Sequence, residues 1–569
     1  MNINNKVDNL GKELFDYFVE SEPVLATYFG IHKYDGLMPD GSPKRHLKDI
    51  KRAKQFLSEF RSIKSSQLSF EKRIDKEVAI HILKLFIFEE DKLRFWEKNP
   101  NEVLNIIGDS LFLLLSRDFA PIELRLKSIA SRLKRTPQLL EETKKSLKSP
   151  VKLWTKLAIE SCIRFPEFLK TIKAVGKQRL KGKDYQILKK GCSETEQAIS
   201  DFKDYLEDVL YPSATEKFAL GPMKFRKLLR LRELGLSSEE ILLIGQRLLA
   251  SEKRRLKRVA NKIKPGAGVN EIREDIKSRY PKDFNEVIRT VKKSILEAKK
   301  FIIKKEFATI PENESLKVLK TPSFMRHIVP FAAYFPPAIF DKEKVGVYIV
   351  TPAEKNIERL KEHSFSSIIN TSVHEGYPGH HLQLVCSATH PSLIRHLSSA
   401  TEFVEGWAHY CEEELKNLGY IDLKTEFIQT LDAVWRAARI IIDVRLSSGE
   451  ISIDEAVNFL IKNTAMERSA AQAEVHRYTH SPAYQLSYLL GKEMLKGLKE
   501  DLKGRLGDNF NERTFHDTLL YSGSLPIKYI RKICKRQLSS LILPACAEAS
   551  AGRYQRQYEI GDYMLSPYK

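Results

Sequence analysis

Residues 372–383 read Ser-Val-His-Glu-Gly-Tyr-Pro-Gly-His-His-Leu-Gln and contain three of the chain's histidines. In the zinc motif H-E-x-x-H, two imidazoles four residues apart lie on one helix face, and the glutamate between them acts as general base. Here position 378 is proline, and the next histidines after His374 are at positions 380 and 381. A straight helix turns ~100° per residue, so His380 would lie about 120° away from the face of His374. A straight helix therefore cannot bring these two side chains together.

Pro378 suggests how the chain could solve this spacing problem. Proline has no N–H to donate, and its ring clashes with the carbonyl one turn earlier, which kinks a helix. The glycines on either side of the Tyr-Pro pair would ease the distortion. We therefore predict a widened H-E-x-G-H helix in which His374 and His380 are metal ligands.

A third ligand is expected downstream, because a catalytic zinc takes three protein ligands and keeps one position open for water. Residues 401–410 read Thr-Glu-Phe-Val-Glu-Gly-Trp-Ala-His-Tyr. Glu405 follows His380 by 25 residues, which leaves room for a turn and an antiparallel returning helix. His409, one helical turn beyond Glu405, is either an alternative ligand or a hydrogen-bonding neighbour of the site. His381 has the same two possibilities, as a substitute for His380.

These two strings resemble the hallmark of domain-of-unknown-function family 885, H-E-x-Y-P-G-H-H-L-Q followed by E-G-W-A-x-Y. The resemblance covers most of the chain, and it departs from the family pattern where a glycine and a glutamine are Ala483 and Tyr484 here. Further matching segments are Pro336-Pro337, Gly346-Val347-Tyr348, Arg477-Tyr478, Pro482 with Tyr488, Phe515-His516-Asp517 and Gly523-Ser524-Leu525-Pro526.

The family is similar to the helical gluzincins of the angiotensin-converting-enzyme and thermostable-carboxypeptidase group. The resemblance implies a mainly α, two-lobed fold with a deep cleft and a small β-hairpin or sheet near the metal helix. It also implies zinc metallopeptidase chemistry, with Glu375 as the base, more firmly than it implies a particular substrate.

Further site residues are expected late in the chain. Tyr488 is the first candidate for the donor that stabilises an oxyanion, and Tyr478 is the second. Arg477 could clamp a substrate carboxylate, or it could form a structural pair with Glu474 or Asp443. Asp443 lies in an apolar helix and must be paired, either with a ligand imidazole or with an arginine.

The order of helical and extended patterns predicts the organisation of the chain. Apolar residues recur at helical spacing up to about residue 306, so residues 1–310 are expected to form a helical scaffold lobe and 311–569 the catalytic lobe. Eleven of the fourteen histidines fall from His327 onward. Residues 345–350 alternate as in a strand, and Tyr348 there is a candidate substrate contact. The strand edge could pair with an extended peptide or could simply cover the core.

The formal net charge of +21 calls for an explanation. Basic runs at residues 252–258 and 292–305 are interleaved with acidic and apolar residues at helical spacing, which indicates solvated helix faces. We therefore expect no nucleic-acid partner. The longest apolar runs are also shorter than the ~18 residues that span a bilayer, so no membrane span is expected.

The cysteines and the N-terminal residues bear on the compartment of the protein. The six cysteines lack C-x-x-C spacing, which favours reduced thiols, and the N-terminal residues are polar without the apolar core of a signal peptide. We expect a cytoplasmic protein, and the sequence does not indicate its oligomeric state.

The main hypothesis is a soluble zinc metallopeptidase that hydrolyses short peptides, as a carboxypeptidase or an oligopeptidase. A metal-dependent amidohydrolase acting on a modified peptide or small amide would use the same residues. A non-catalytic basic helical protein that binds nucleic acid or an anionic membrane is the third possibility, although it would not need to retain Glu375.

Overall fold

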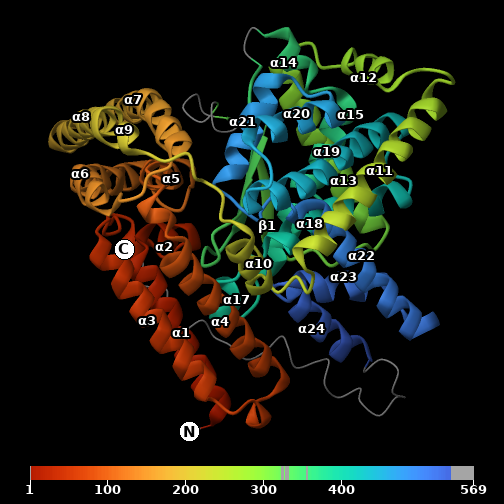
Figure 1. Cartoon of the computed structure of the whole chain (residues 1–569), viewed down its shortest axis with the longest axis horizontal. Helices are drawn as coiled ribbons and strands as arrows, with labels where there is room; N and C mark the ends of the chain where they lie inside the picture. The colour runs from red at the N-terminus through yellow and green to blue at the C-terminus, as the bar shows by residue number, and fades with distance from the viewer. Residues whose placement is uncertain (1, 322–325, 327–331, 354–355, 540–569) are drawn as a thin grey trace. The chain divides into compact units, whose positions relative to one another are not determined.

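Helices make up 73% of the structure and strands 4%, which confirms the expected mainly α class. The computed structural model describes residues 2–321, 326, 332–353 and 356–539 (Figure 1). The described residues of 1–218 and 338–342 form one compact unit, and those of 219–337 and 343–542 form another. Residues 219–310, which the sequence analysis placed with the scaffold lobe, thus lie in the same unit as the histidine motif.

The first unit is built from helices whose ends follow the sequence signals. Pro121 immediately precedes one helix, and the Ser42 and Ser69 hydroxyls accept backbone N–H groups at the starts of two others. The helices are α1 (Ile3–Ser21), α2 (Pro23–Phe29), α3 (Pro43–Ser62), α4 (Phe70–Phe88), α5 (Asn101–Ser116), α6 (Ile122–Ser146), α7 (Lys152–Arg179), α8 (Gly182–Tyr205) and α9 (Tyr211–Ser213).

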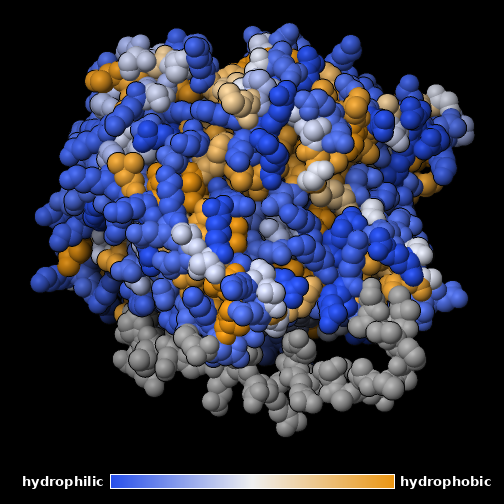
Figure 2. Space-filling model, turned by 60° about the horizontal axis from the view of Figure 1, so that its bottom comes forward, coloured by the Kyte–Doolittle hydropathy of each residue, from blue (hydrophilic) through white to orange (hydrophobic). Residues whose placement is uncertain are grey.

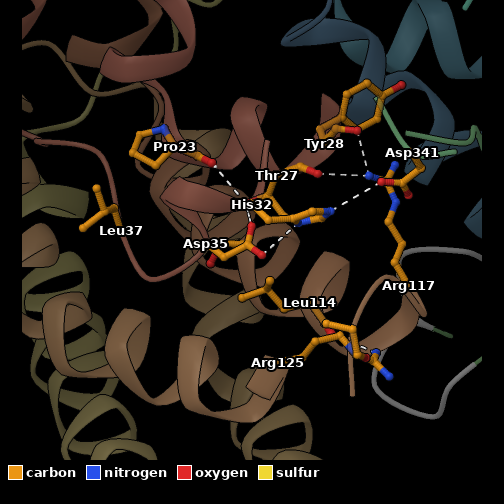
Figure 3. A network of polar contacts seen from close by, with 12 residues as sticks. Pro23, Thr27, Tyr28, His32, Asp35, Leu37, Leu114, Arg117, Arg125 and Asp341 are labelled. Carbon is orange, nitrogen blue, oxygen red and sulfur yellow. Dashed lines mark hydrogen bonds and ion pairs between the residues drawn. The ribbon is translucent and has the colours of Figure 1, made fainter. Parts of the chain in front are cut away.

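The short segment 338–342 belongs to the first unit, and Figure 3 shows the contact of its Asp341 with His32, which follows α2. The Phe340 amide donates to the Phe29 carbonyl at 2.9 Å. His32 connects Asp35 and Asp341, with its ring nitrogens 3.0 and 3.4 Å from their carboxylate oxygens. Segment 338–342 is therefore held by residues of the N-terminal part of its own unit.

The second unit surrounds the long helix α19, which packs against α11, α15, α20 and α22. Ala437, Ala438, Ile440 and Ile442 of α19 are fully buried. The helices of this unit are α10 (Pro222–Leu231), α11 (Ser238–Ile263), α12 (Val269–Lys277), α13 (Phe284–Lys304), α14 (Ile357–Lys361), α15 (Phe365–Glu375), α16 (His380–Ser387), α17 (Leu393–His396), α18 (Thr401–Asn417), α19 (Leu423–Ser448), α20 (Ile453–Thr464), α21 (Arg468–Thr479), α22 (Ser487–Leu506), α23 (Glu512–Tyr521) and α24 (Ile527–Ser539).

A small sheet lies beside the histidine motif, as expected. It contains β1 (Glu314–Lys320), β2 (Ala332–Phe335) and β3 (Lys344–Val350) in the order β1-β3-β2. Strand β1 is parallel to β3 and β2 is antiparallel to it, so the arrangement is a mixed sheet rather than a simple hairpin. Residues 322–325 and 327–331, which include His327, lie outside the described residues.

The basic runs are partly neutralised within the fold. On α11, Arg255 lies 3.5 Å from Glu252 and 3.2 Å from Glu426. On the face shown in Figure 2, hydrophilic residues predominate and hydrophobic ones are interspersed among them. Among the described helices, none is both long and apolar enough to cross a membrane.

The crossing of α18 and α22 depends on two glycines that allow the backbones to touch. A Cβ on Gly491 would overlap the carbonyl oxygen of Glu402, and one on Gly406 would lie 2.5 Å from the carbonyl carbon of Gly491. Gly406 is the glycine of the E-G-W-A string. Glycine is therefore needed at position 406 because α18 and α22 pack closely. This packing brings Glu405 on α18 next to the residues that precede α22.

We expect Gly491→Ala to lower the free energy of unfolding by about 3 kcal/mol, because the added methyl group has no space. Gly497→Ala on the same helix is the matched control, since a Cβ there meets no atom within 4 Å. The control should be neutral or stabilising by up to ~1 kcal/mol through helix propensity. Urea unfolding of both variants measures the difference, and equal stabilities would refute the close-packing explanation.

His516 on α23 is fully buried, and both of its ring nitrogens have partners. Nδ1 lies 2.8 Å from the Phe307 carbonyl oxygen, and Nε2 lies 2.9 Å from the Tyr410 hydroxyl on α18. A neutral ring satisfies both contacts, donating from Nδ1 and accepting at Nε2. Burial lowers the pKa of His516 to about 4.

We expect His516 to make the protein less stable in acid. An unfolded histidine titrates near ~6.5, and the folded pKa is about 4. Between these values the unfolded state binds more protons, so stability rises with pH and about 3 kcal/mol is lost as pH falls through this window. Urea unfolding across pH 4–7 should give a shallower pH dependence for His516→Gln than for the wild type. Parallel curves would contradict this assignment.

Candidate metal centre

The histidine motif is divided between two helices, which corrects the prediction of one widened helix. Helix α15 ends at Glu375, and α16 begins at His380 after a four-residue link that contains a cis Tyr377–Pro378 bond. The Gly379 amide donates to the Val373 carbonyl at 3.1 Å, and a Cβ on Gly379 would overlap the His374 carbonyl oxygen. The link therefore folds so tightly against the end of α15 that only glycine fits at position 379.

The E-G-W-A helix holds this link in place. The Trp407 indole N–H of α18 donates to the Pro378 carbonyl at 2.8 Å, and the Cys411 thiol lies 3.5 Å from the same oxygen. Trp407 and Cys411 are both fully buried. The two sequence strings thus pack directly on each other, so that α18 sets the geometry of the histidine motif.

His374, His380 and Glu405 converge, as the sequence analysis expected. Glu405 Oε2 lies 3.4 Å from His380 Nε2 and 3.8 Å from His374 Nε2. The three potential ligand atoms lie within 4.8 Å of one another. The imidazole rings of the two histidines are nearly perpendicular, with centroids 4.7 Å apart.

This donor set fits a divalent cation such as zinc. Two imidazole nitrogens and one carboxylate oxygen form a known three-ligand set for catalytic zinc. Bonds of ~2.0–2.1 Å in a tetrahedral arrangement keep ligand atoms about 3.3 Å apart. The separations of 3.4 and 3.8 Å from Glu405 are close to that value.

Glu412 on α18 completes the support of His374 and was not predicted from the sequence. Its Oε1 lies 2.7 Å from His374 Nδ1 and 3.2 Å from His409 Nδ1. A carboxylate on one nitrogen orients the imidazole so that the other can bind a metal. Glu412 follows Glu405 by two helical turns, so their shared helix face was a usable signal. His409 belongs to this supporting group through its contact with Glu412.

The charges of the site favour a cation. Burial disfavours a charged ring, but hydrogen bonds with Glu405 and Glu412 raise the pKa of His374 to about 10. Burial also opposes ionisation of Glu405, yet its hydrogen bonds with His374 and His380 hold the pKa of this carboxyl well below its ordinary value. Burial lowers the pKa of His409 to about 4. The cluster thus stabilises a positive charge between its carboxylates.

His381 faces a different network. Its Nε2 lies 2.6 Å from Glu314 on β1, and its Nδ1 lies 2.9 Å from the Tyr334 hydroxyl on β2. The Tyr377 hydroxyl also donates to Glu314, at 2.5 Å, and Lys299 forms an ion pair with it. Both nitrogens of His381 are therefore engaged in attaching α16 to the sheet. Neither points to the cluster of His374 and His380.

The close approach of the sheet to α16 requires Gly346. A Cβ on Gly346 of β3 would lie 2.5 Å from His381 Nδ1 and 2.6 Å from the Tyr334 hydroxyl. Two residues further along β3, the buried Tyr348 lies opposite Tyr334 in the strand register. Burial, reinforced by the charge of Glu375, raises the pKa of Tyr348 well above its ordinary value. Tyr348 is therefore a neighbour of the candidate base.

Glu375 is the last residue of α15 and directly follows His374. It is half-buried, and its carboxylate makes no hydrogen bond or ion pair with the residues that the structure describes. The other carboxylates of the cluster, Glu405 and Glu412, are engaged by histidines. Of these three carboxylates, Glu375 is the one that no histidine engages in the described part of the chain.

Tyr484 contacts Glu405 directly, and Tyr488 lies beside Tyr484. The Tyr484 hydroxyl donates to Glu405 Oε1 at 2.9 Å, and its ring meets that of Tyr488 edge-on at 5.8 Å. The Tyr488 ring lies 5.9 Å from the His409 ring. Burial and the charge of Glu405 raise the pKa of Tyr488, which keeps its hydroxyl protonated.

Tyr478 and Arg477 share the carboxylate of Glu474. The Tyr478 hydroxyl donates to Glu474 at 2.9 Å and accepts from Arg439 at 2.8 Å. Arg477 donates to the same Glu474 at 2.8 Å, and 39% of its side chain remains exposed. Tyr478 therefore belongs to a buried network, whereas the side chain of Arg477 is partly exposed.

Asp443 anchors the turn before α22 rather than a ligand imidazole. Its two oxygens accept the Ala483 amide at 2.9 Å and the Leu486 amide at 3.1 Å. Burial raises the pKa of Asp443 to about 6. Ala483 has a φ of +65°, a left-handed conformation that glycine adopts more readily than alanine.

The fold and site define a mainly helical protein with a two-histidine, one-glutamate candidate metal centre. The chain belongs to the family described as bacterial protein of unknown function (DUF885), whose sequence profile matches residues 23–533. No curated protein gives a significant match.

Two solved structures share the fold. A "putative lipoprotein of unknown function" from Shewanella oneidensis is 20% identical, with a TM-score of 0.75, and the alignment covers 92% of this chain and 98% of that one. A "putative lipoprotein" from Colwellia psychrerythraea is 18% identical, with a TM-score of 0.82 and coverage of 95% and 100%. At these identities the similarity establishes the fold alone.

We expect His380→Ala to abolish metal binding and His381→Ala to retain it. Of these two histidines, His380 is the one with a ring nitrogen that faces Glu405. The His381 variant should instead lose about 1–3 kcal/mol of stability, since Glu314 and Tyr334 lose a buried partner. Metal content after dialysis and urea unfolding measure the two effects. A metal-free His381 variant beside a loaded His380 variant would reverse the assignment.

Proposed function

We propose that this protein is a zinc-dependent metallopeptidase that hydrolyses short peptides. The observation that carries the proposal is the convergence of His374, His380 and Glu405, beside Glu375, whose carboxylate makes no hydrogen bond or ion pair within the described part of the chain. A site that has lost its metal and its activity would not need a buried carboxylate hydrogen-bonded to one of the ligand histidines. Glu412, which engages His374 at 2.7 Å, is such a residue.

His374, His380 and Glu405 would hold the metal. A bound zinc ion supplies the Lewis acidity that activates water and polarises a carbonyl group. Glu375 accepts the proton of the attacking water and passes it to the leaving amine. Tyr488 is the donor proposed for the oxyanion, because its protonated hydroxyl belongs to the tyrosine pair that contacts Glu405.

Two features support a peptide as the substrate. Strands β1 and β2 are the edges of the small sheet that packs on α16, and an edge can pair with an extended peptide backbone. Arg477, with accessible donors, could bind a substrate carboxylate, which would suit a carboxypeptidase. The compartment stays a prediction, since the descriptions as lipoproteins concern the two relatives.

The decisive experiment compares wild type with Glu375→Gln. We expect about one zinc per chain in both, with hydrolysis of a peptide library reduced ~10²–10⁴-fold in the variant, because proton transfer is lost. Glu297→Gln is the matched control, since this glutamate is 55% exposed on α13. The control should retain both zinc and activity, and a chelator should remove the activity of the wild type.

Other outcomes would favour a different function. Zinc-bound wild type that leaves peptides intact but hydrolyses small amides in a Glu375-dependent way would indicate an amidohydrolase. Wild type without metal that binds nucleic acid or anionic vesicles, and loses this binding as salt rises, would indicate the non-catalytic basic protein. Either result would refute the peptidase proposal.

A further inference from the structure

The two oxygens of Glu405 have different partners. Oε2 faces His380 Nε2 at 3.4 Å and His374 Nε2 at 3.8 Å. Oε1 accepts the hydroxyl of Tyr484 at 2.9 Å. The side chain of Glu405 is 12% exposed, so bulk water does not compete freely for the second oxygen. One oxygen is thus available to a cation while the other is occupied by a protein donor.

Tyr484 is held in this position by a rigid turn. The preceding Ala483 has a left-handed φ of +65°, which costs a residue other than glycine about 1–2 kcal/mol. Its amide donates to Asp443 at 2.9 Å, and its carbonyl accepts a hydrogen bond from Arg232. Such backbone strain persists only where the surroundings enforce it. At Ala483 both the amide and the carbonyl are held by hydrogen bonds, with Asp443 and Arg232 respectively.

Arg232, which binds the Ala483 carbonyl, also contacts α18. It forms an ion pair with Glu402 at 2.8 Å, one helical turn before Glu405. Asp443 further accepts the Leu486 amide at 3.1 Å. The residues on both sides of Tyr484 and the helix that carries Glu405 are therefore fixed by the same buried charges. The hydroxyl–carboxylate contact is built into the fold and does not depend on a loose side chain.

We propose that Tyr484 is a positioning residue that restricts Glu405 to one ligand oxygen and thereby selects four-coordinate zinc. Manganese and calcium take more ligands, and calcium commonly takes both oxygens of a carboxylate. Bidentate binding would place the metal on the same Glu405 oxygen that accepts the Tyr484 hydroxyl, and this hydrogen bond makes that oxygen a weaker second ligand. This inference rests on the proposed metal centre and adds a determinant of its selectivity.

The test is Tyr484→Phe, which removes one hydroxyl and keeps the ring. We expect the ratio of zinc to manganese affinity to fall about 10–100-fold, the usual effect of losing a partner of a metal ligand. Cobalt-loaded wild type should show the intense visible absorption of four-coordinate Co²⁺, and the variant should show the weaker bands of a higher coordination number. Tyr420→Phe is the matched control, because it removes a hydroxyl that donates to the Ser294 carbonyl, not to Glu405.

Each result has a defined meaning. Wild type that binds zinc and cobalt, with an unchanged affinity ratio and cobalt spectrum in Tyr484→Phe, would overturn the role of Tyr484 but leave the metal centre intact. Wild-type cobalt protein with only weak bands would overturn the selectivity claim without any variant. Wild type that binds neither metal would overturn the metal centre and this inference together.

Discussion

The tight reversal between α15 and α16 is the constraint on which the site depends. His374 and His380 can face the same carboxylate only because the chain leaves one helix at Glu375 and starts another at His380. The Gly379 backbone lies against the His374 carbonyl, where no side chain fits, and Trp407 of α18 donates to the Pro378 carbonyl inside the link. Helix α18 therefore both supplies Glu405 and fixes the link that presents the histidines to it.

A buried group of carboxylates and imidazoles is costly unless its charges are paired. Here each charged group has its own partner. Glu405 Oε2 faces the Nε2 atoms of His374 and His380, and Glu412 contacts Nδ1 of His374. The Tyr484 hydroxyl donates to Oε1 of Glu405. The carboxylates thus favour a positive charge between Glu405 and the two histidines. On the other side of α16, His381 and Glu314 form a second buried pair that attaches the helix to the sheet.

The spacing of the histidines, together with the E-G-W-A string, was enough to predict that His374, His380 and Glu405 converge. Residue order was also enough to predict a small sheet before the motif. The sequence did not indicate the break between α15 and α16, because proline and two glycines are compatible with either a bulge or a link. It also left Glu314 unnoticed, since a glutamate in a strand 67 residues before His381 carries no local signal.

Local chemistry in the chain, then, determined the helical class and the residue types that a candidate metal centre and a candidate base would need, because helix periodicity and residue type act over short distances. Tertiary structure decided which histidine faces Glu405, that Asp443 holds a turn, that Tyr478 belongs to a buried network, and that Tyr484 touches Glu405. These choices depend on contacts between residues 25 to 79 positions apart in the sequence. Such contacts are set by packing, which no short window of sequence contains.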